Sequence, residues 1–263
     1  LNFTNRTLEE SDISGFFIEL RDAARLISMK YFRSRLSIDQ KEDQSPVTIA
    51  DKSIEEELKK LVSKRYPKHG IVGEESSKRE GEQYIWYIDP IDGTKSFISG
   101  MPLFGSLIAL SESETDKSIA GMIDMPALNE TWFGINGRSF FNSNPIHTSK
   151  CITLETAQIY TTSPDIFSAH DWNIFDRVSR KARFRRFGGD CYIYGLLASG
   201  HCDLVIEASL YSFDFMPLIP IIEGAGGIIC DWQGNKLKPN SDGHVIAAAN
   251  RELMDQALKL INA

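Results

Sequence analysis

Two aspartates, three positions apart, are the residues of this chain whose types and spacing first suggest chemistry. Asp89 and Asp92 follow the apolar run Tyr84–Ile88, which predicts a buried strand, and the residues after it are typical of a turn. The segment Asp92–Thr94 predicts the start of a helix, where free N–H groups attract anions. Carboxylates that hold hard cations, beside N–H groups that hold a phosphate, suit the cleavage of a phosphoester. A surface turn is the alternative, and this segment alone does not separate the two.

Three other acidic residues have a similar local setting. Asp51 starts a helix predicted for residues 51–66, Glu74 follows the short apolar strand Ile71–Gly73, and Asp214 precedes a predicted helix. Each has a structural explanation of its own. Asp51 and Asp214 suit helix N-caps, and Glu74 suits an exposed acidic loop. Their occurrence together at strand ends and helix starts is what favours a shared site.

The composition limits the classes of function. A formal net charge of −7 argues against a general nucleic-acid binder or a polybasic membrane binder, but metal ions can supply the positive charge that a phosphate ester needs. No apolar run reaches about 18 residues, so we expect no membrane span. The four cysteines lack C-x-x-C spacing, which predicts reduced thiols in a cytoplasmic protein and no zinc site. The chain starts without Met or the apolar core of a signal peptide, so we expect its first residues to be missing or processed.

Alternating helices and strands predict a layered mixed α/β fold. In the first half, apolar spacing predicts a long helix over residues 8–36, a loop over 37–45, and later strands that pair antiparallel because their connections are short. The second half begins near residue 146. There we expect a helix over residues 192–199, ended by Gly200, and strands and helices at 159–162, 170–182, 183–187, 203–207, 216–224, 228–231, 245–248 and 251–261.

Several motifs in chain order together resemble the inositol monophosphatase family of magnesium-dependent phosphatases. They cover nearly the whole chain and are Gly73–Ser76, Trp86–Thr94, Asp214 and Glu223–Gly227. One departs from the family pattern: Trp-Asp-x-Ala is replaced by Phe213-Asp214-Phe215-Met216, which keeps the carboxylate. The resemblance implies one compact unit with a five-layer αβαβα sandwich. Residues 1–145 would carry most metal ligands, and residues 146–263 the last metal ligand and substrate-binding residues.

The resemblance also implies a role for each site residue. Oxygen ligands suit Mg²⁺, and two or three ions would be held by Glu74, Asp89, Asp92, Asp214 and the Ile91 carbonyl. Asp51, Glu74 and Thr94 would be catalytic by orienting and activating the attacking water, without a phosphoenzyme. The substrate would be bound by Asp92, Gly93, Thr94, Gly189, Asp190, Glu207 and Asp214. Lithium sensitivity and a homodimer are further expectations from the family.

A branch of the family is suggested by the residues around three of these positions. Lys95–Gly100 after the aspartate motif, Gly189–Tyr192, and Asp203–Glu207 resemble the histidinol-phosphate phosphatases of histidine biosynthesis. Inositol-specific members usually have a small residue where Asp190 stands. A carboxylate there suits histidinol phosphate, because that substrate carries an amine and inositol phosphate does not. Asp190 also suits the N-cap of the following helix, and the two roles are compatible.

Four other functions compete with this prediction. An inositol-1-monophosphatase of broad specificity keeps the reaction and changes the substrate. A phosphatase acting on a nucleotide such as 3′-phosphoadenosine 5′-phosphate is disfavoured because the chain has no long insertion to hold a nucleotide. A non-catalytic, transcription-associated role resembles that of some bacterial members, and the complete acidic set argues against it. A metal-free structural domain requires five carboxylates to converge by accident.

Overall fold

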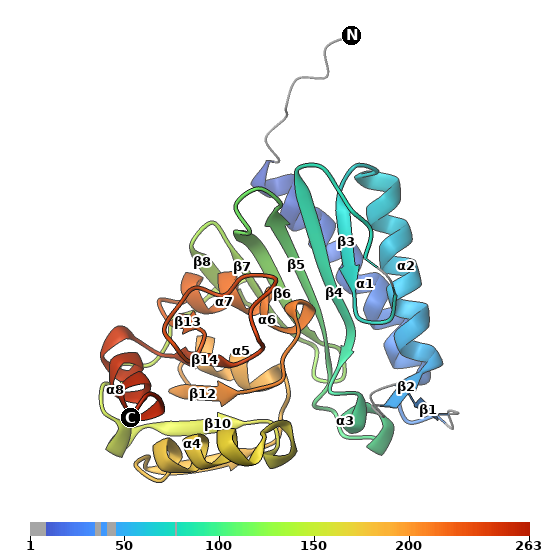
Figure 1. The fold of residues 1–263 in the computed structure, drawn as a ribbon. Coiled ribbons are helices and arrows are strands. Elements are labelled where there is room, and N and C mark those ends of the chain that lie inside the picture. Colours follow the sequence, from blue (N-terminus) through green and yellow to red (C-terminus); the bar gives the residue numbers. More distant parts are fainter. Residues whose placement is uncertain (1–8, 35–37, 41–45, 77) are drawn as a thin grey trace.

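Two β-sheets form the framework of the protein in this computed structural model, which describes residues 9–34, 38–40, 46–76 and 78–263 (Figure 1). The first sheet has strand order β3-β4-β5-β6-β7-β8-β9. Its first pair is parallel and the other pairs are antiparallel. The strands are β3 (Gly70–Gly73), β4 (Tyr84–Asp92), β5 (Gly105–Glu112), β6 (Ser118–Met125), β7 (Glu130–Ile135), β8 (Arg138–Phe141) and β9 (Asn144–Pro145).

The second sheet has strand order β11-β10-β12-β14-β13. Strand β10 runs parallel to both of its neighbours, and β14 is antiparallel to both of its own. The strands are β10 (Gln158–Thr161), β11 (Phe184–Phe187), β12 (Leu204–Glu207), β13 (Ile228–Cys230) and β14 (Val245–Ala248). The first sheet therefore uses residues before 146 and the second uses residues after it, whereas the proposed division into halves remains a prediction.

Helices complete five layers (Figure 1). Helices α1 and α2 cover the outer face of the first sheet, α5, α6 and α7 lie between the sheets, and α4 and α8 cover the outer face of the second. This is the predicted αβαβα sandwich. The helices are α1 (Glu10–Tyr31), α2 (Ile49–Arg65), α3 (Thr94–Ser99), α4 (Ala169–Ser179), α5 (Tyr192–Ala198), α6 (Ser212–Phe215), α7 (Leu218–Gly224) and α8 (Arg251–Ile261), with 3₁₀ turns η1 (Leu154–Thr156) and η2 (Pro164–Ile166).

The first part of β4, Tyr84–Ile88, is apolar because both faces of the strand are covered. Trp86 and Ile88 are fully buried in the core that includes α1 and α2, whereas Tyr87 belongs to the core that includes α5 and α7. A strand buried on both faces has a fixed position between two layers of helices. The acidic residues at its end therefore start from a rigid element.

Three predictions about the first half were wrong in detail. Helix α1 ends at Tyr31, well before residue 36. Part of the predicted loop, Ile38–Gln40, is strand β1 and pairs antiparallel with β2 (Pro46–Thr48), while residues 37 and 41–45 lie outside the described residues. Helix α2 starts at Ile49 with Thr48 as its N-cap, so Asp51 is not the cap.

Among the described helices, none combines the length and apolar character that a membrane crossing requires.

Candidate active site

A bulge in β4 brings Asp89 and Asp92 to the same side of the strand. Asp89 pairs with Leu107 of β5 and Asp92 with Gly105, so three steps along β4 match two steps along β5. Residues three apart in a regular strand point to opposite faces, and one extra residue restores a common face. Pro90 at the bulge cannot donate to a ladder, and its carbonyl accepts a hydrogen bond from the Ser106 hydroxyl at 2.7 Å.

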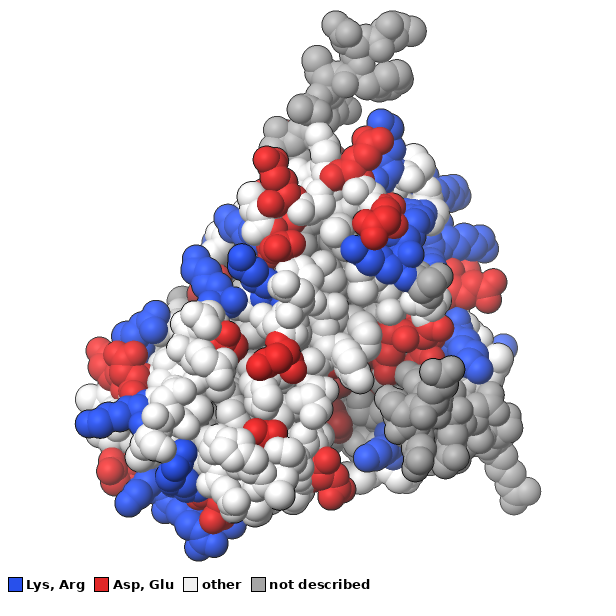
Figure 2. Space-filling view, viewed as in Figure 1, with Lys and Arg blue, Asp and Glu red and all other residues white. Residues whose placement is uncertain are grey.

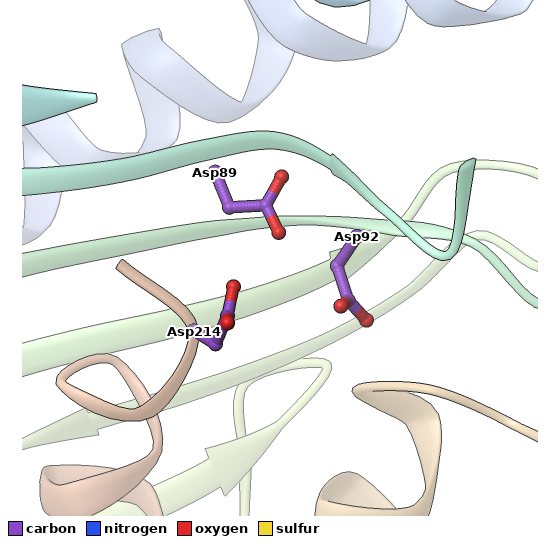
Figure 3. Close-up of side chains that lie close together, drawn as sticks. All are labelled: Asp89, Asp92 and Asp214. Atoms are coloured by element: carbon purple, nitrogen blue, oxygen red, sulfur yellow. The ribbon is translucent and has the colours of Figure 1, made fainter. Parts of the chain in front are cut away.

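Asp214 reaches the same place from the layer of helices between the sheets. It lies at the third position of the short helix α6, where its Oδ2 accepts a hydrogen bond from the Tyr211 backbone N–H at 2.7 Å. The alternative role of Asp214 as an N-cap is therefore not found, since Tyr211 occupies that position. One candidate ligand atom each from Asp89, Asp92 and Asp214 lies within 4.8 Å of the others, and Figure 3 shows the three side chains converging from β4 and α6.

Glu74 and Asp51 lie beside this group. Glu74 directly follows β3, and its N–H donates to the Ile88 carbonyl at 3.2 Å, which continues the pairing of β3 with β4. Asp51 is buried on α2, and its Oδ2 accepts hydrogen bonds from the Thr48 N–H and hydroxyl at 2.8 and 2.6 Å. Its Oδ1 is buried and has no hydrogen-bond partner among the described residues. The negative charge of Glu74 raises the pKa of Asp51, Asp89 and Asp214, and that of Asp92 raises the pKa of Asp89 and Asp214. The five acids are therefore close enough to repel one another.

Crowding and burial oppose ionisation of these acids. Burial is the largest cause that raises the pKa of Asp89, Asp92 and Asp214, and the charges of neighbouring carboxylates raise each further. For Asp92 the pKa rises to about 8. Several buried carboxylates can be ionised together at neutral pH only if positive charge lies among them.

The residues fit the divalent cation that the resemblance implies. All the candidate side-chain ligands are carboxylates, the ligand type that hard cations such as Mg²⁺ prefer. Asp89 Oδ1 is buried and has no hydrogen-bond partner among the described residues, so one oxygen of this carboxylate is open to an ion. The Ile91 carbonyl accepts the Thr94 hydroxyl at 3.1 Å and has a second lone pair that this bond does not use.

Gly93 and Thr94 form the predicted helix start after the aspartates. Gly93 has a φ of 81° and is the N-cap of α3, which begins at Thr94. A side chain at Gly93 would be strained by this φ, and its Cβ would lie 3.0 Å from both the Asp190 carboxylate and the Leu103 carbonyl. A glycine is therefore required to bring the backbone close to Asp190.

Asp190 is held beside Asp92 by an unusual stretch of backbone. Gly188, Gly189 and Asp190 all have positive φ, at 94°, 120° and 47°. Asp190 lies before the Cys191 N-cap of α5 and makes no side-chain cap, so the cap role that the sequence allowed beside substrate binding is not found. Its Oδ2 accepts the Ser96 hydroxyl at 3.2 Å, and the next residue, Cys191, donates its N–H to Asp92 Oδ2 at 2.5 Å.

Glu207, at the end of β12, has both carboxylate oxygens satisfied. Oε1 accepts the Thr162 N–H at 2.8 Å, and Oε2 accepts the hydroxyl of the buried Tyr194 at 3.0 Å. Burial raises the pKa of Glu207 to about 7, although the hydrogen bonds from Thr162 and Tyr194 oppose the rise. Glu207 is thus a carboxylate of fixed orientation, and protein donors occupy one lone pair of each oxygen.

A pocket of about 180 Å³ joins the cation site to these two acids. Its walls include Asp92, Asp214, Asp190, Glu207 and Tyr194. Asp190 and Thr162 also line a wider neighbouring pocket of about 490 Å³ that includes Gly189, whereas Gly189 is absent from the walls of the first. On the face shown in Figure 2, acidic side chains reach the surface at several points near the middle, and Lys and Arg lie mostly toward the margins.

Sequence reasoning missed several partners of the site acids. Tyr194 and Glu55 are both almost fully buried. Tyr194 lies four residues after Asp190, and Glu55 lies four residues after Asp51. That spacing places residues on one helix face and could have indicated Glu55. The Cys191 and Thr162 backbone donors carried no signal in the residue types, because any residue except proline offers an N–H.

Known proteins resemble this chain over most of its length. Residues 9–263 match the model of the Inositol monophosphatase family. The bifunctional phosphatase IMPL2, chloroplastic, of Arabidopsis thaliana is 45% identical over 91% of this chain and 72% of its own length. A histidinol-phosphatase of Chlorobaculum parvum is 34% identical over 88% of this chain and 90% of its own.

A solved structure agrees with the fold. An inositol monophosphatase from Zymomonas mobilis is 42% identical, superposes with a TM-score of 0.89, and covers 98% of this chain and 100% of its own. The matches to named phosphatases, together with the clustered acids, identify a phosphatase of the metal-dependent type. The chain belongs to the inositol monophosphatase family.

Proposed function

We propose that this phosphatase hydrolyses L-histidinol phosphate to L-histidinol and phosphate with Mg²⁺. The observation that carries the proposal is the pair of extra carboxylates, Asp190 and Glu207, which line one pocket with Asp92 and Asp214. A cation cluster does not need these two acids for its chemistry. A substrate whose organic part carries an amine and an imidazole complements them, whereas the hydroxyl groups of an inositol ring add no positive charge.

Each site residue has a task in this proposal. The oxygens of Glu74, Asp89, Asp92, Asp214 and the Ile91 carbonyl would hold two or three Mg²⁺. When bound, Mg²⁺ supplies positive charge that lowers the pKa of a water and neutralises the leaving oxygen. Glu74, Asp51 and Thr94 would orient the attacking water, and the open Asp51 Oδ1 is suited to accept its hydrogen bond.

The substrate contacts complete the proposal. The N–H groups of Gly93 and Thr94, at the start of α3, would donate to the phosphate beside Asp92 and Asp214. Gly189 would bring the chain close to the substrate, while Asp190 and Glu207 would face the organic part. No side chain becomes phosphorylated, because the oxygens of Asp89 are assigned to cation binding.

The substrate assignment is tested by phosphate release from histidinol phosphate and inositol 1-phosphate at equal Mg²⁺ concentration. We expect kcat/KM for histidinol phosphate to be higher by at least about 100-fold, which corresponds to roughly 3 kcal/mol of discrimination. Equal or faster turnover of inositol 1-phosphate would reject the substrate and leave the reaction class standing.

The ligand assignment is tested by Asp92→Asn. The substitution removes a negative charge from the cation site while keeping an oxygen that can accept the Cys191 N–H. We expect kcat to fall by at least roughly 1,000-fold, as for loss of a group that acts in the transition state. Retained turnover would contradict the assignment of Asp92.

An inositol-1-monophosphatase is the second candidate function, because the Zymomonas mobilis relative of that name is 42% identical. The same comparison of substrates decides between the two. A transcription-associated role without catalysis would instead leave phosphate release absent and RNA polymerase retained in a pull-down. A homodimer, cytoplasmic location and inhibition by lithium remain predictions.

A further inference from the structure

Helix α2 carries a second buried acid that the proposed chemistry does not use. Glu55 lies one turn after Asp51, and the two residues are 2% and 1% exposed. A glutamate is rarely buried unless its carboxylate oxygens have partners. The partners of Glu55 therefore show what this residue holds in place.

Both oxygens of Glu55 bind the chain directly after Glu74. Oε2 accepts the backbone N–H of Glu75 at 2.7 Å, and Oε1 accepts the hydroxyl of Ser76. Lys59, one turn further along α2, donates to the Ser76 hydroxyl oxygen at 2.6 Å and lies 4.0 Å from Glu55 Oε1. Charge-assisted hydrogen bonds of this kind are stronger than those between neutral groups.

Glu55 also contacts the residue directly before Glu74. A Cβ added to Gly73 would lie 2.5 Å from the carboxyl carbon of Glu55, so the glycine backbone rests against the carboxylate. Glu74 itself is tied to β4 through the bond from its N–H to the Ile88 carbonyl. The backbone of Glu74 is thus fixed on three sides, by Gly73 against Glu55, by Glu75 bonded to Glu55, and by β4.

We propose that Glu55 is a positioning residue that sets the backbone of Glu74 and thereby raises the affinity of the site for its divalent cation. This inference rests on the proposed role of Glu74 as a cation ligand. Without Glu55, the turn after β3 would lose two acceptors, and the Glu74 carboxylate would have to be ordered when the cation binds. That ordering would reduce the free energy of binding.

The test is calorimetric titration of the metal-free protein with Mn²⁺, used as a probe for Mg²⁺, well below the unfolding temperature. Glu55→Gln keeps the size of the side chain and leaves one acceptor oxygen for two donors. We expect its Kd to rise by about 10-fold, within the range of about 10- to 100-fold seen when a group supporting a metal ligand is changed. Its kcat should return toward that of the wild type at saturating Mg²⁺. Glu56→Gln is the matched control, because Glu56 is exposed on the same helix, and its Kd should not change.

Two more variants keep the test decisive. Ser76→Ala removes one donor at an exposed position and should fold normally, with a rise in Kd of roughly 2- to 5-fold. Wild-type Kd in both Glu55→Gln and Ser76→Ala overturns the inference, even if Glu55→Gln melts earlier, since lower stability alone indicates a structural role. Glu74→Gln separates the two proposals: if it binds Mn²⁺ and turns over as the wild type does, the ligand assignment of Glu74 fails instead.

Discussion

At the scale of residues, similar carboxylates differ in what their neighbours leave open. Asp89 keeps a buried oxygen without a hydrogen-bond partner among the described residues, Asp92 receives one backbone N–H, and Glu207 receives two donors. An open oxygen suits a cation, whereas an oxygen held by donors suits a fixed contact with a substrate. The same functional group can therefore serve two tasks in one candidate site.

Tyr194→Phe tests the task of Glu207. The substitution removes the hydroxyl that bonds Glu207 Oε2, while the ring still fills its buried site. Because the carboxylate is then held by one donor, we expect kcat/KM for histidinol phosphate to fall by about 10-fold, equivalent to roughly 1.4 kcal/mol. Turnover of inositol 1-phosphate should change less. Tyr84→Phe, away from the pocket, is the control, and an equal loss for both substrates in Tyr194→Phe would contradict the predicted effect on specificity.

At the scale of elements, a guanidinium of α1 binds a buried carboxylate of the first sheet. Arg25 bonds Asp124 of β6 in three contacts of 2.7 to 3.0 Å, and also Thr131 of β7 and Asn129 between the two strands. Asp124 is fully buried, and a buried carboxylate without its cation is costly. Helix α1 thus supplies the positive charge that neutralises Asp124 in the sheet.

Removing this charge should weaken the whole fold. For Arg25→Met we expect the free energy of unfolding to fall by roughly 2–4 kcal/mol. A fully buried ion pair would cost more when broken, but the Arg25 side chain is 22% exposed. Urea unfolding measures the change. Arg21→Met on the same helix breaks a pair with the exposed Asp22 and should cost less than about 1 kcal/mol. Similar losses in both variants would show that Asp124 does not depend on Arg25.

Where β3 begins, His69 predicts a dependence of stability on pH. The Trp86 indole N–H donates to His69 Nδ1 at 3.0 Å, so the ring accepts as a neutral group. Burial and the charge of Arg79 lower its pKa from 6.5 to about 4. Since the folded pKa is below the unfolded one, the unfolded chain binds a proton first as the pH falls. Stability is therefore lost between about pH 6.5 and pH 4.

His69→Gln isolates this effect, because glutamine can accept the Trp86 N–H and does not titrate. Between about pH 7 and pH 5, we expect the wild type to lose roughly 1–2 kcal/mol of unfolding free energy relative to the variant. Urea unfolding at each pH gives the free energy of unfolding of both proteins. The contributions of acids elsewhere in the chain are the same in both and cancel in the difference. Parallel curves for the two proteins would mean that the pKa of His69 is the same in the folded and unfolded states.

At the scale of the whole molecule, the candidate site joins parts of the chain that are distant in sequence. Asp89 and Asp92 belong to a strand of the first sheet, and Asp214 lies in α6, between that sheet and the second. A cation held by all three would link these layers and relieve their mutual repulsion. Binding should therefore stabilise the fold as well as enable catalysis.

We expect Mg²⁺ at about 100 times its Kd to raise Tm by roughly 5–10 °C relative to protein in EDTA, since binding at that concentration contributes about 2.7 kcal/mol. Scanning calorimetry gives the shift. Asp214→Asn, which keeps an acceptor for the Tyr211 N–H, should shift much less. The same rise in the variant would place the stabilising ion elsewhere.

The long apolar strands and the ends of several elements could be predicted from the sequence. Strands β4 to β8 and their antiparallel pairing followed from apolar runs with short connections. Helix α5 ends at Ala198, and Gly200, directly after the Ser199 C-cap, has a φ of 78°. Local residue types decide such features. The cap predicted at Asp51 was wrong and the cap role allowed for Asp190 is not found, because Thr48 and Cys191 occupy the cap positions.

The sequence by itself determined which candidate catalytic and ligand residues the protein has and which family motifs they form, because these depend only on residue types and their order. Only the tertiary structure decided which atoms meet. The bulge that aligns Asp89 with Asp92, the Cys191 N–H on Asp92, and the support of Glu74 by Glu55 depend on contacts between separate elements. Such contacts arise when apolar faces pack, and packing brings together residues whose sequence separation carries no signal of their proximity.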